Sequence, residues 1–250
     1  MTEAADRLIV ALDFSSADSA KTLVDQLDGV VSFFKVGLEL HLVGGTEMVN
    51  WLLARGKRVF LDLKYNDIEE TVERTVRQAA KLGISFLTVH GGGKIVQAAV
   101  NGRGDADLKI LIVTVLTSLD NDDMRDLGFA CTVDDLVLAR AKRAAELGCD
   151  GVIASGREAR TIREQVGGQI VIVTPGIRQS DGSMDDHKRH VDARTAICEG
   201  ANYIVVGRPI RNAANPRAAA EEFVRQIQAG LDGRVQSGGK PPFNSAHAPV

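Results

Sequence analysis

Apolar and polar positions follow one unit that recurs along the chain: a short β-branched run, a polar turn, and a stretch with helical spacing. The runs predict strands at 8–12, 30–37, 58–64, 85–89, 108–116, 151–155, 169–174 and 201–206. The stretches between them predict helices after Ser15 or Ser16, at 46–55, 68–82, 94–100 and 133–147, from about 157, and at 191–199 and 216–229. Three of these helices are expected to end at Gly83, Gly148 and Gly200.

Strand–helix units in this number are typical of a (β/α)8 TIM barrel, an α/β fold in which a closed parallel sheet lies inside a ring of helices. An open doubly wound sheet is the alternative, but no Gly-x-Gly-x-x-Gly fingerprint follows the first strand. No linker divides the chain, so we expect a single domain over 1–232. Residues 233–250 are rich in Gly, Pro and Ser without periodicity, which indicates a flexible tail.

Composition narrows the functional classes. Apolar residues make up 44% of the chain and aromatic residues 4%, which favours a parallel sheet with an aliphatic core. The net charge of −3, with both signs interspersed, argues against a nucleic-acid partner. No apolar run reaches membrane-spanning length and the chain starts with no signal peptide, so we expect a cytoplasmic protein without a membrane partner.

Two smaller features have simple interpretations. The cysteines Cys131, Cys149 and Cys198 are too few and too far apart for a disulfide framework, and we expect them to be small core residues. The run Asp120-Asn-Asp-Asp123 lacks the glycine and the final glutamate of a calcium loop, which favours a helix cap or a solvated turn.

Charged residues stand at the predicted end of the third strand. Asp62 and Lys64 would share one face of extended backbone, and Asp67 lies near the first turn of the next helix. Charges of both signs beside a buried strand are costly unless they pair or take part in chemistry. A structural ion pair is the simpler interpretation, because Asp-x-Lys-x-x-Asp alone is weak evidence.

The barrel fold gives the other strand ends a meaning, because active sites of these barrels lie at the carboxyl ends of the strands. Polar residues stand at most of the predicted ends, including Asp13, Lys35, His90, Thr117 with Ser118, Arg178 and Arg208. Lysines and aspartates around one mouth suit proton transfer or the binding of a charged substrate.

The last two strand ends predict a phosphate site, since these barrels often bind phosphate with the loops after strands seven and eight. Here the loops carry Pro175-Gly-Ile-Arg178 and Gly207-Arg-Pro209. Glycine lets backbone N–H groups approach an anion, and arginine binds it with two hydrogen bonds. An ordinary turn with an exposed arginine is the alternative.

Together these motifs closely resemble the orotidine 5′-monophosphate decarboxylase family in its bacterial form. The resemblance extends from about residue 7 to 229, with the motifs in the same order. It rests on Asp13, Phe34-Lys-Val-Gly37, Asp62-x-Lys64-x-x-Asp67-Ile68-x-x-Thr71, Val115-Leu-Thr-Ser118, Thr174-Pro-Gly-Ile-Arg178 and Val206-Gly-Arg-Pro209.

The resemblance implies decarboxylation of orotidine 5′-monophosphate to uridine 5′-monophosphate and carbon dioxide, the last step of de novo pyrimidine biosynthesis. It implies that no metal or cofactor takes part. Lys64 would protonate C6 of the pyrimidine, and Asp62 would lie against the substrate carboxylate. Lys35 and Asp67 would complete this charged array and contact the ribose.

The same resemblance implies the remaining substrate contacts. Asp13 would bind the ribose hydroxyls and Thr117 the pyrimidine. The phosphate would be bound by Arg178, Gly207 and Arg208. His187 stands where bacterial members usually carry a glutamine that bridges phosphate and base, and a histidine there would still donate to phosphate; a solvated loop histidine is the alternative.

The resemblance also implies a homodimer. Asp67, Ile68 and Thr71 match residues that reach across a dimer interface in the family, so each active site would be completed by the second chain. Asn66 stands where many members carry a histidine, a difference that changes a turn residue and leaves the charged array intact.

Elementary chemistry makes the lysine assignment reasonable. Loss of carbon dioxide leaves a carbanion in the plane of the pyrimidine ring, where the π system does not delocalise it. An ammonium group that neutralises this charge and also delivers the proton meets both needs. Aspartates on both sides of Lys64 favour its protonated form.

Two other functions remain open from the sequence. Magnesium-dependent sugar-phosphate decarboxylases or aldolases of the same broader barrel group share Asp-x-Lys-x-x-Asp, but they carry a metal-binding glutamate on strand two. Lys35 would repel a divalent cation at that place. A catalytically inactive phosphate-binding barrel is the second alternative, and the intact charged array argues against it.

Overall fold

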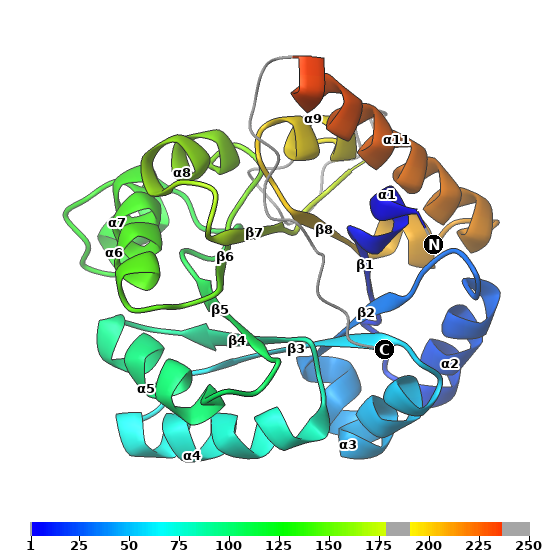
Figure 1. Cartoon of the computed structure of the whole chain (residues 1–250), viewed down its shortest axis with the longest axis horizontal. Coiled ribbons are helices and arrows are strands. Elements are labelled where there is room, and N and C mark those ends of the chain that lie inside the picture. Colours follow the sequence, from blue (N-terminus) through cyan, green and yellow to red (C-terminus); the bar gives the residue numbers. More distant parts are fainter. Residues whose placement is uncertain (1, 179–190, 237–250) are drawn as a thin grey trace.

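Eight parallel strands close into a barrel, each paired with its neighbours in sequence order and the last paired with the first (Figure 1). The structure is a computed structural model, and it describes residues 2–178 and 191–236. The strands are β1 (Leu8–Ala11), β2 (Phe33–Gly37), β3 (Arg58–Tyr65), β4 (Phe86–His90), β5 (Lys109–Val113), β6 (Gly151–Ile153), β7 (Val171–Thr174) and β8 (Tyr203–Val206). The predicted (β/α)8 barrel is confirmed.

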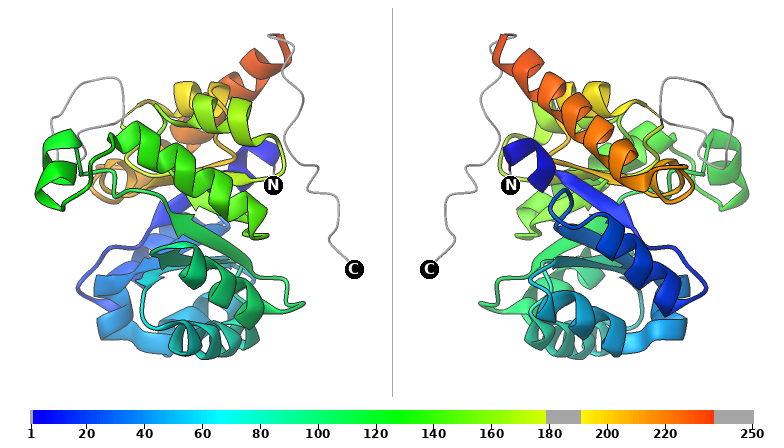
Figure 2. Two further views of the ribbon diagram at one scale, coloured as in Figure 1. Left: turned by 90° about the vertical axis from the view of Figure 1, so that its left-hand side faces the viewer. Right: turned by 90° about the vertical axis from the view of Figure 1, so that its right-hand side faces the viewer.

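Helices form the outer layer of the barrel (Figure 1). In the described residues they are α1 (Glu3–Asp6), α2 (Ala17–Gln26), α3 (Leu38–Ala54), α4 (Glu69–Ala79) with the 3-10 turn η1 (Ala80–Leu82), α5 (Gly93–Arg103), α6 (Asn121–Asp126), α7 (Val133–Glu146), α8 (Ala159–Val166), α9 (Ala193–Cys198), α10 (Arg208–Arg211) and α11 (Pro216–Gln236). In the two side views, α11 runs along the outside of the barrel (Figure 2), and it packs against α9 and α1. The last unit of the chain therefore closes the ring against the first.

Two layers of side chains make up the core. The layer between strands and helices is aliphatic, as the composition predicted. The barrel interior holds a separate cluster in which aromatic rings meet edge to face, with Phe33 and Phe86 centroids 4.9 Å apart and Phe86 and Tyr203 centroids 5.1 Å apart. These three residues begin their strands, so they fill the amino-terminal end of the barrel. The carboxyl-terminal end is left for polar groups.

Local signals set several helix ends. Ser16 caps α2 by accepting a hydrogen bond from the Ser19 N–H, and it is one of the two serines predicted for that role. Asp120 caps α6 with a reciprocal capping box, which confirms the capping interpretation of that acidic run. Gly83 follows η1 with a φ of 76°, the left-handed conformation expected of a terminating glycine.

Some predicted boundaries are wrong for identifiable reasons. The helix predicted at 46–55 begins at Leu38, because two helical segments meet at Gly45, which has non-helical dihedral angles, and only the second segment has a clear apolar period. The short helices α1, α6 and α10 were not predicted as helices, since each spans too few residues to show a period of 3.6. The helix α11 continues to Gln236, so residues 233–236, placed in the tail from the sequence, are helical.

The expectation that all three cysteines are core residues is corrected. Cys149 is buried, but Cys131 and Cys198 are exposed, because one lies in the loop before α7 and the other ends α9. Residues 237–250 lie outside the described residues. Among the helices that the structure describes, none combines the length and apolar character needed to span a bilayer.

Candidate active site

A cavity of about 510 Å³ opens at the carboxyl ends of the strands, opposite the aromatic end of the barrel. Its floor includes the apolar side chains of Phe60, Val113 and Ile153. Of the site residues predicted from the sequence, the cavity brings together Asp13, Lys35, Asp62, Lys64, Thr117, Arg178, Gly207 and Arg208. At least one residue predicted to contact each of the phosphate, the ribose, the pyrimidine and the carboxylate therefore lies around one cavity.

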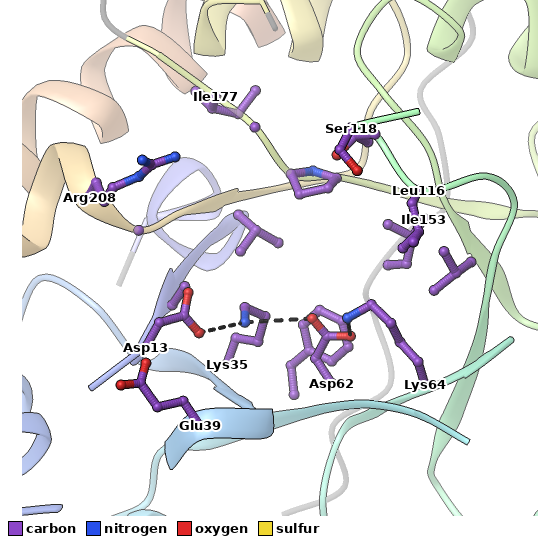
Figure 3. A pocket seen from close by; sticks show the side chains of 18 of the residues that line it. Asp13, Lys35, Glu39, Asp62, Lys64, Leu116, Ser118, Ile153, Ile177 and Arg208 are labelled. Atoms are coloured by element: carbon purple, nitrogen blue, oxygen red, sulfur yellow. Dashed lines mark hydrogen bonds and ion pairs between the residues drawn. The ribbon is translucent and has the colours of Figure 1, made fainter. Parts of the chain in front are cut away.

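Four charged side chains of alternating sign form a continuous row in this cavity (Figure 3). Lys35 Nζ donates to Asp13 Oδ1 at 2.9 Å and lies 3.5 Å from Asp62 Oδ2. Lys64 Nζ donates to Asp62 Oδ1, also at 2.9 Å. We call these four side chains the charged row. Its members form ion pairs with one another, and these pairs offset the desolvation cost of placing charges beside a buried strand.

Strand alternation aims the charged row into the barrel. Successive side chains of a strand point to opposite faces, so residues two positions apart share a face. Three members of the row each lie two positions beyond an interior side chain, with Asp13 beyond Ala11, Lys35 beyond Phe33, and Asp62 beyond Phe60. The sequence period that predicted these strands is therefore also what directs their last polar side chains inward.

Gly37 leaves room for one pair of the row. A Cβ atom at this position would lie 2.9 Å from both Asp13 Oδ1 and Lys35 Nζ. Any side chain at position 37 would push these two atoms from their places, so the close pair requires glycine here.

Burial and pairing together fix the ionisation of the central two members. Burial disfavours the charge on Lys35, but Asp62 and Asp13 outweigh it and raise the pKa of this ammonium above its ordinary value. Burial likewise opposes the charge on Asp62, but Lys35 and Lys64 outweigh it and lower the pKa of this carboxyl. Lys35 therefore stays an ammonium and Asp62 a carboxylate throughout the neutral range.

The backbone of Lys64 is unusual. Its φ of 52° is the one positive φ at a non-glycine residue in the part of the chain that the structure describes. Pairing between β3 and β4 is interrupted after Leu61 and resumes at Tyr65, so the lysine lies in an irregular stretch of the strand. A left-handed conformation costs a residue with a side chain about 1–2 kcal/mol. Such strain persists only where the surrounding structure holds the residue in place, and it occurs most often at functional positions.

The loops after β7 and β8 form another wall of the cavity. Arg178, Gly207 and Arg208 all line it, and Figure 3 shows Arg208 on the opposite side of the cavity from Lys64. The Arg178 N–H donates to the Val191 carbonyl at 3.2 Å, which ties the strand-seven loop to the segment that returns before α9. Two guanidinium groups and a glycine at one wall provide the chemistry for a phosphate group.

Three predicted residues lie elsewhere. Asp67 is exposed, and its Oδ1 accepts a hydrogen bond from the Ile68 N–H at 2.7 Å. The side chain of Ile68 is 65% exposed, and Thr71 is half-buried on α4. Within the described residues, none of the three lines the cavity of this chain. His187 lies outside the described residues.

His90, another polar residue at a predicted strand end, is not among the described residues that line the cavity. It is half-buried, and burial together with the nearby charges of Arg140 and Lys64 lowers its pKa. A neutral His90 imidazole places no second positive charge on β4 beside the Lys64 ammonium.

The sequence pattern missed three residues of the site. Glu39 and Arg211 line the cavity from the helices that follow β2 and β8. Thr88 is completely buried on β4, and its hydroxyl bonds to Asp62. Glu39 and Arg211 lie only a few residues past strand ends, so extending the candidate positions beyond the last residue of each strand would have included them. Thr88 gave no signal, because a threonine in a β-branched run is indistinguishable from a core residue.

In residues 2–178 and 191–236, no group of three or more His, Cys, Asp or Glu side chains is arranged to hold a metal ion. Two carboxylates of the cavity, Asp13 and Asp62, have the Lys35 ammonium between them.

Related proteins match nearly the whole chain. The sequence model of the orotidine 5′-phosphate decarboxylase / HUMPS family matches residues 6–223. A protein of Nitrobacter winogradskyi named orotidine 5′-phosphate decarboxylase is 54% identical over 228 residues, which cover 91% of this chain and 95% of that protein. A protein of the same name from Methylococcus capsulatus is 51% identical over 226 residues, with coverages of 90% and 93%.

A solved structure agrees with these sequence relatives. The crystal structure of orotidine 5′-phosphate decarboxylase from Lactobacillus acidophilus superposes with a TM-score of 0.79 at 35% sequence identity. The superposition covers 90% of this chain and 100% of that one. By sequence and by fold, this chain belongs to the orotidine 5′-phosphate decarboxylase / HUMPS family.

Proposed function

We propose that the protein decarboxylates orotidine 5′-monophosphate to uridine 5′-monophosphate and carbon dioxide, the last step of de novo pyrimidine biosynthesis. The names of the relatives and their coverage of the chain support the reaction class. The observation that carries the proposal is the Lys64 ammonium, held 2.9 Å from the Asp62 carboxylate inside a cavity with arginines at another wall.

The cavity suits the parts of this substrate. Its phosphate would bind Arg178 and Arg208, its ribose hydroxyls would bind Asp13, and its pyrimidine would lie near Thr117. A nucleotide held in this way extends from the arginine wall towards the charged row, so its carboxylate reaches Asp62. Binding of the distant phosphate would then supply free energy to the step at the pyrimidine.

The charged row provides the chemistry at C6. The bond between C6 and the carboxylate breaks, carbon dioxide leaves, and the electron pair stays on C6. Lys64 donates a proton from Nζ to that pair, and its amine regains a proton from solvent. Because Asp62 remains ionised, it accepts the hydrogen bond from Lys64 Nζ before the step and faces the substrate carboxylate with a like charge.

We propose that the reaction needs no metal or cofactor. A magnesium-dependent enzyme, the alternative that the sequence left open, would need the site's carboxylates for its metal. Here Lys35 occupies the space between Asp13 and Asp62, and its ammonium would repel a divalent cation.

The assay for these proposals follows the ultraviolet absorbance band of orotidine 5′-monophosphate after mixing with purified protein, with and without EDTA. We expect the band to disappear at the same rate in both, with uridine 5′-monophosphate as the product. Loss that EDTA abolishes would show metal dependence instead. No turnover by folded protein would refute the decarboxylase function.

We also propose a homodimer in which Asp67, Ile68 and Thr71 of one chain complete the cavity of the other. All three lie outside the cavity of their own chain in the described structure. Large apolar side chains are exposed after the paired strands β2 and β3: Leu38 (63%) and Leu42 (87%) in the first turns of α3, and Ile68 (65%) just before α4. Exposed apolar groups on neighbouring strand ends favour a protein partner.

A mixing experiment tests this arrangement. Lys64→Ala and Asp67→Ala variants are each expected to be nearly inactive alone. In a mixed dimer, one cavity carries both defects and the other carries neither, so activity should return when the two proteins are dissociated and reassociated together. A mixture as inactive as its components would contradict a shared active site.

The expected cytoplasmic location stays a prediction.

A further inference from the structure

The irregular stretch of β3 leaves the Lys64 backbone in need of a partner. Ladder pairing with β4 stops after Leu61 and resumes only at Tyr65, so no carbonyl of β4 receives the Lys64 N–H within the ladder. An N–H shielded from water and without an acceptor is costly, and this partly buried one belongs to a residue already in the left-handed conformation. Some group must compensate if the lysine is to stay in place.

The hydroxyl of Thr88 supplies that acceptor. Thr88 Oγ1 accepts a hydrogen bond from the Lys64 N–H at 3.0 Å and donates one to Asp62 Oδ1 at 2.9 Å. The Lys64 ammonium donates to the same Asp62 oxygen. The backbone of the lysine and the side chain of the aspartate are thereby joined through one hydroxyl group.

Thr88 itself is held firmly. It is completely buried, and its backbone pairs with Leu111 in β5, on the regular side of the sheet. Branching at Cβ restricts its χ1 angle, so the hydroxyl has a fixed direction. A rigid β4 thus holds the irregular end of β3 through this single side chain.

We propose that Thr88 is a positioning residue for decarboxylation, which sets the Lys64 ammonium and the Asp62 carboxylate relative to the reacting C6 without touching the substrate. This inference rests on the proposed function. If the hydroxyl is removed, the Lys64 N–H loses its acceptor, its backbone relaxes from the left-handed conformation, and Asp62 loses a donor. Both groups then shift relative to a substrate that remains bound through its phosphate and ribose.

The test compares Thr88→Val with Thr88→Ser and with a matched control, Thr114→Val. Valine keeps the shape of threonine and removes only the hydroxyl, whereas serine restores the hydroxyl. Thr114 is also a completely buried threonine, just beyond the end of β5, but its hydroxyl donates to the Ile153 carbonyl at 2.8 Å, away from the charged row. For each variant, kcat and KM with orotidine 5′-monophosphate, the dissociation constant of uridine 5′-monophosphate, and the thermal unfolding temperature are measured.

We expect kcat of Thr88→Val to fall by roughly a hundredfold, the effect of misplacing reacting groups by about 1 Å. KM and the uridine 5′-monophosphate dissociation constant should change by less than about threefold, since binding at a distance from the reacting atoms is preserved. Thr88→Ser should recover most of the lost kcat, and Thr114→Val should keep kcat near that of the wild type. This split between kcat and binding is what a merely structural role would not produce.

The proposal is overturned if Thr88→Val keeps the wild-type kcat, if Thr88→Ser is as slow as Thr88→Val, or if Thr114→Val loses as much kcat. Should Thr88→Val fail to fold, Thr88→Ala against Thr88→Ser repeats the comparison, because these differ only by the hydroxyl, and equal kcat values would overturn the proposal. A wild type without decarboxylase activity would refute the proposed function and this inference together. An active wild type matched by Thr88→Val would refute the inference alone.

Discussion

Substitution of Gly37 by alanine should lower activity with only a modest fall in stability. The added Cβ would lie 2.9 Å from Asp13 Oδ1 and 2.9 Å from Lys35 Nζ, so these atoms must move. Both are the ends of flexible side chains, which shift more easily than backbone. The φ of −95° at Gly37 is open to any residue, so alanine brings no backbone strain of its own.

The size of the effect follows from the Lys35–Asp13 pair. Stretching a pair of unit charges from 2.9 Å to about 3.6 Å at an effective dielectric constant of about 20 costs about 1 kcal/mol. Losing the charge-assisted hydrogen bond adds about 1–2 kcal/mol. If the transition state loses at least half of this interaction free energy as stabilisation, kcat/KM falls roughly tenfold to a hundredfold. The folded state loses the same interactions, but alanine in place of glycine restricts the unfolded chain and regains about 0.4–1 kcal/mol, so the free energy of unfolding falls by about 1–2.6 kcal/mol.

The assay measures kcat/KM with orotidine 5′-monophosphate together with the thermal unfolding temperature. Gly168→Ala is the matched control, since a Cβ there meets no atom within 4 Å. The control should keep both activity and stability. Wild-type activity in Gly37→Ala would refute the inference that the close pair in the charged row matters for catalysis. A loss of activity accompanied by a large fall in unfolding temperature would refute its local origin.

Two further outcomes concern titratable groups. Because the pKa of Lys35 is raised above 10.5, its pairing should stabilise the fold below that pH and cease to do so as pH rises through the folded-state pKa. The unfolding temperatures of the wild type and Lys35→Met should therefore differ most below pH 10.5 and converge above it; a constant difference would contradict this. Burial raises the pKa of the Cys149 thiol to about 11, so iodoacetamide at pH 8 should leave it unmodified in the native protein while alkylating the exposed Cys131 and Cys198. Mass spectrometry of tryptic peptides checks this, and alkylation of Cys149 at the rate of the other two would contradict its burial.

The sequence predicted the part of the site that depends on strand alternation. Asp62 and Lys35 point into the barrel because they continue the two-residue period of their strands, and that period is visible in the apolar pattern. The conformation of Lys64 was not predictable in this way, since the break in pairing between β3 and β4 is a property of two strands together. The role of Thr88 was hidden for the same reason, because its partners come from another strand.

Other features depend on contacts that a linear pattern does not contain. Arg211 lines the cavity from the four-residue α10, which is too short to show a helical period. The exposure of Cys198 depends on where α9 ends relative to α11. Asp67 was assigned to the site by resemblance, and the proposal that places it in a catalytic cavity requires a second chain.

The central claim, that Lys64 transfers the proton at C6, is tested most directly by running its step in reverse. Uridine 5′-monophosphate is incubated with the protein in deuterium oxide, and the C6 proton is followed by nuclear magnetic resonance. A lysine that protonates C6 must also remove that proton, so we expect exchange with the wild type and none with a Lys64→Ala variant that still binds the nucleotide. Exchange by Lys64→Ala at the wild-type rate would show that another group transfers the proton.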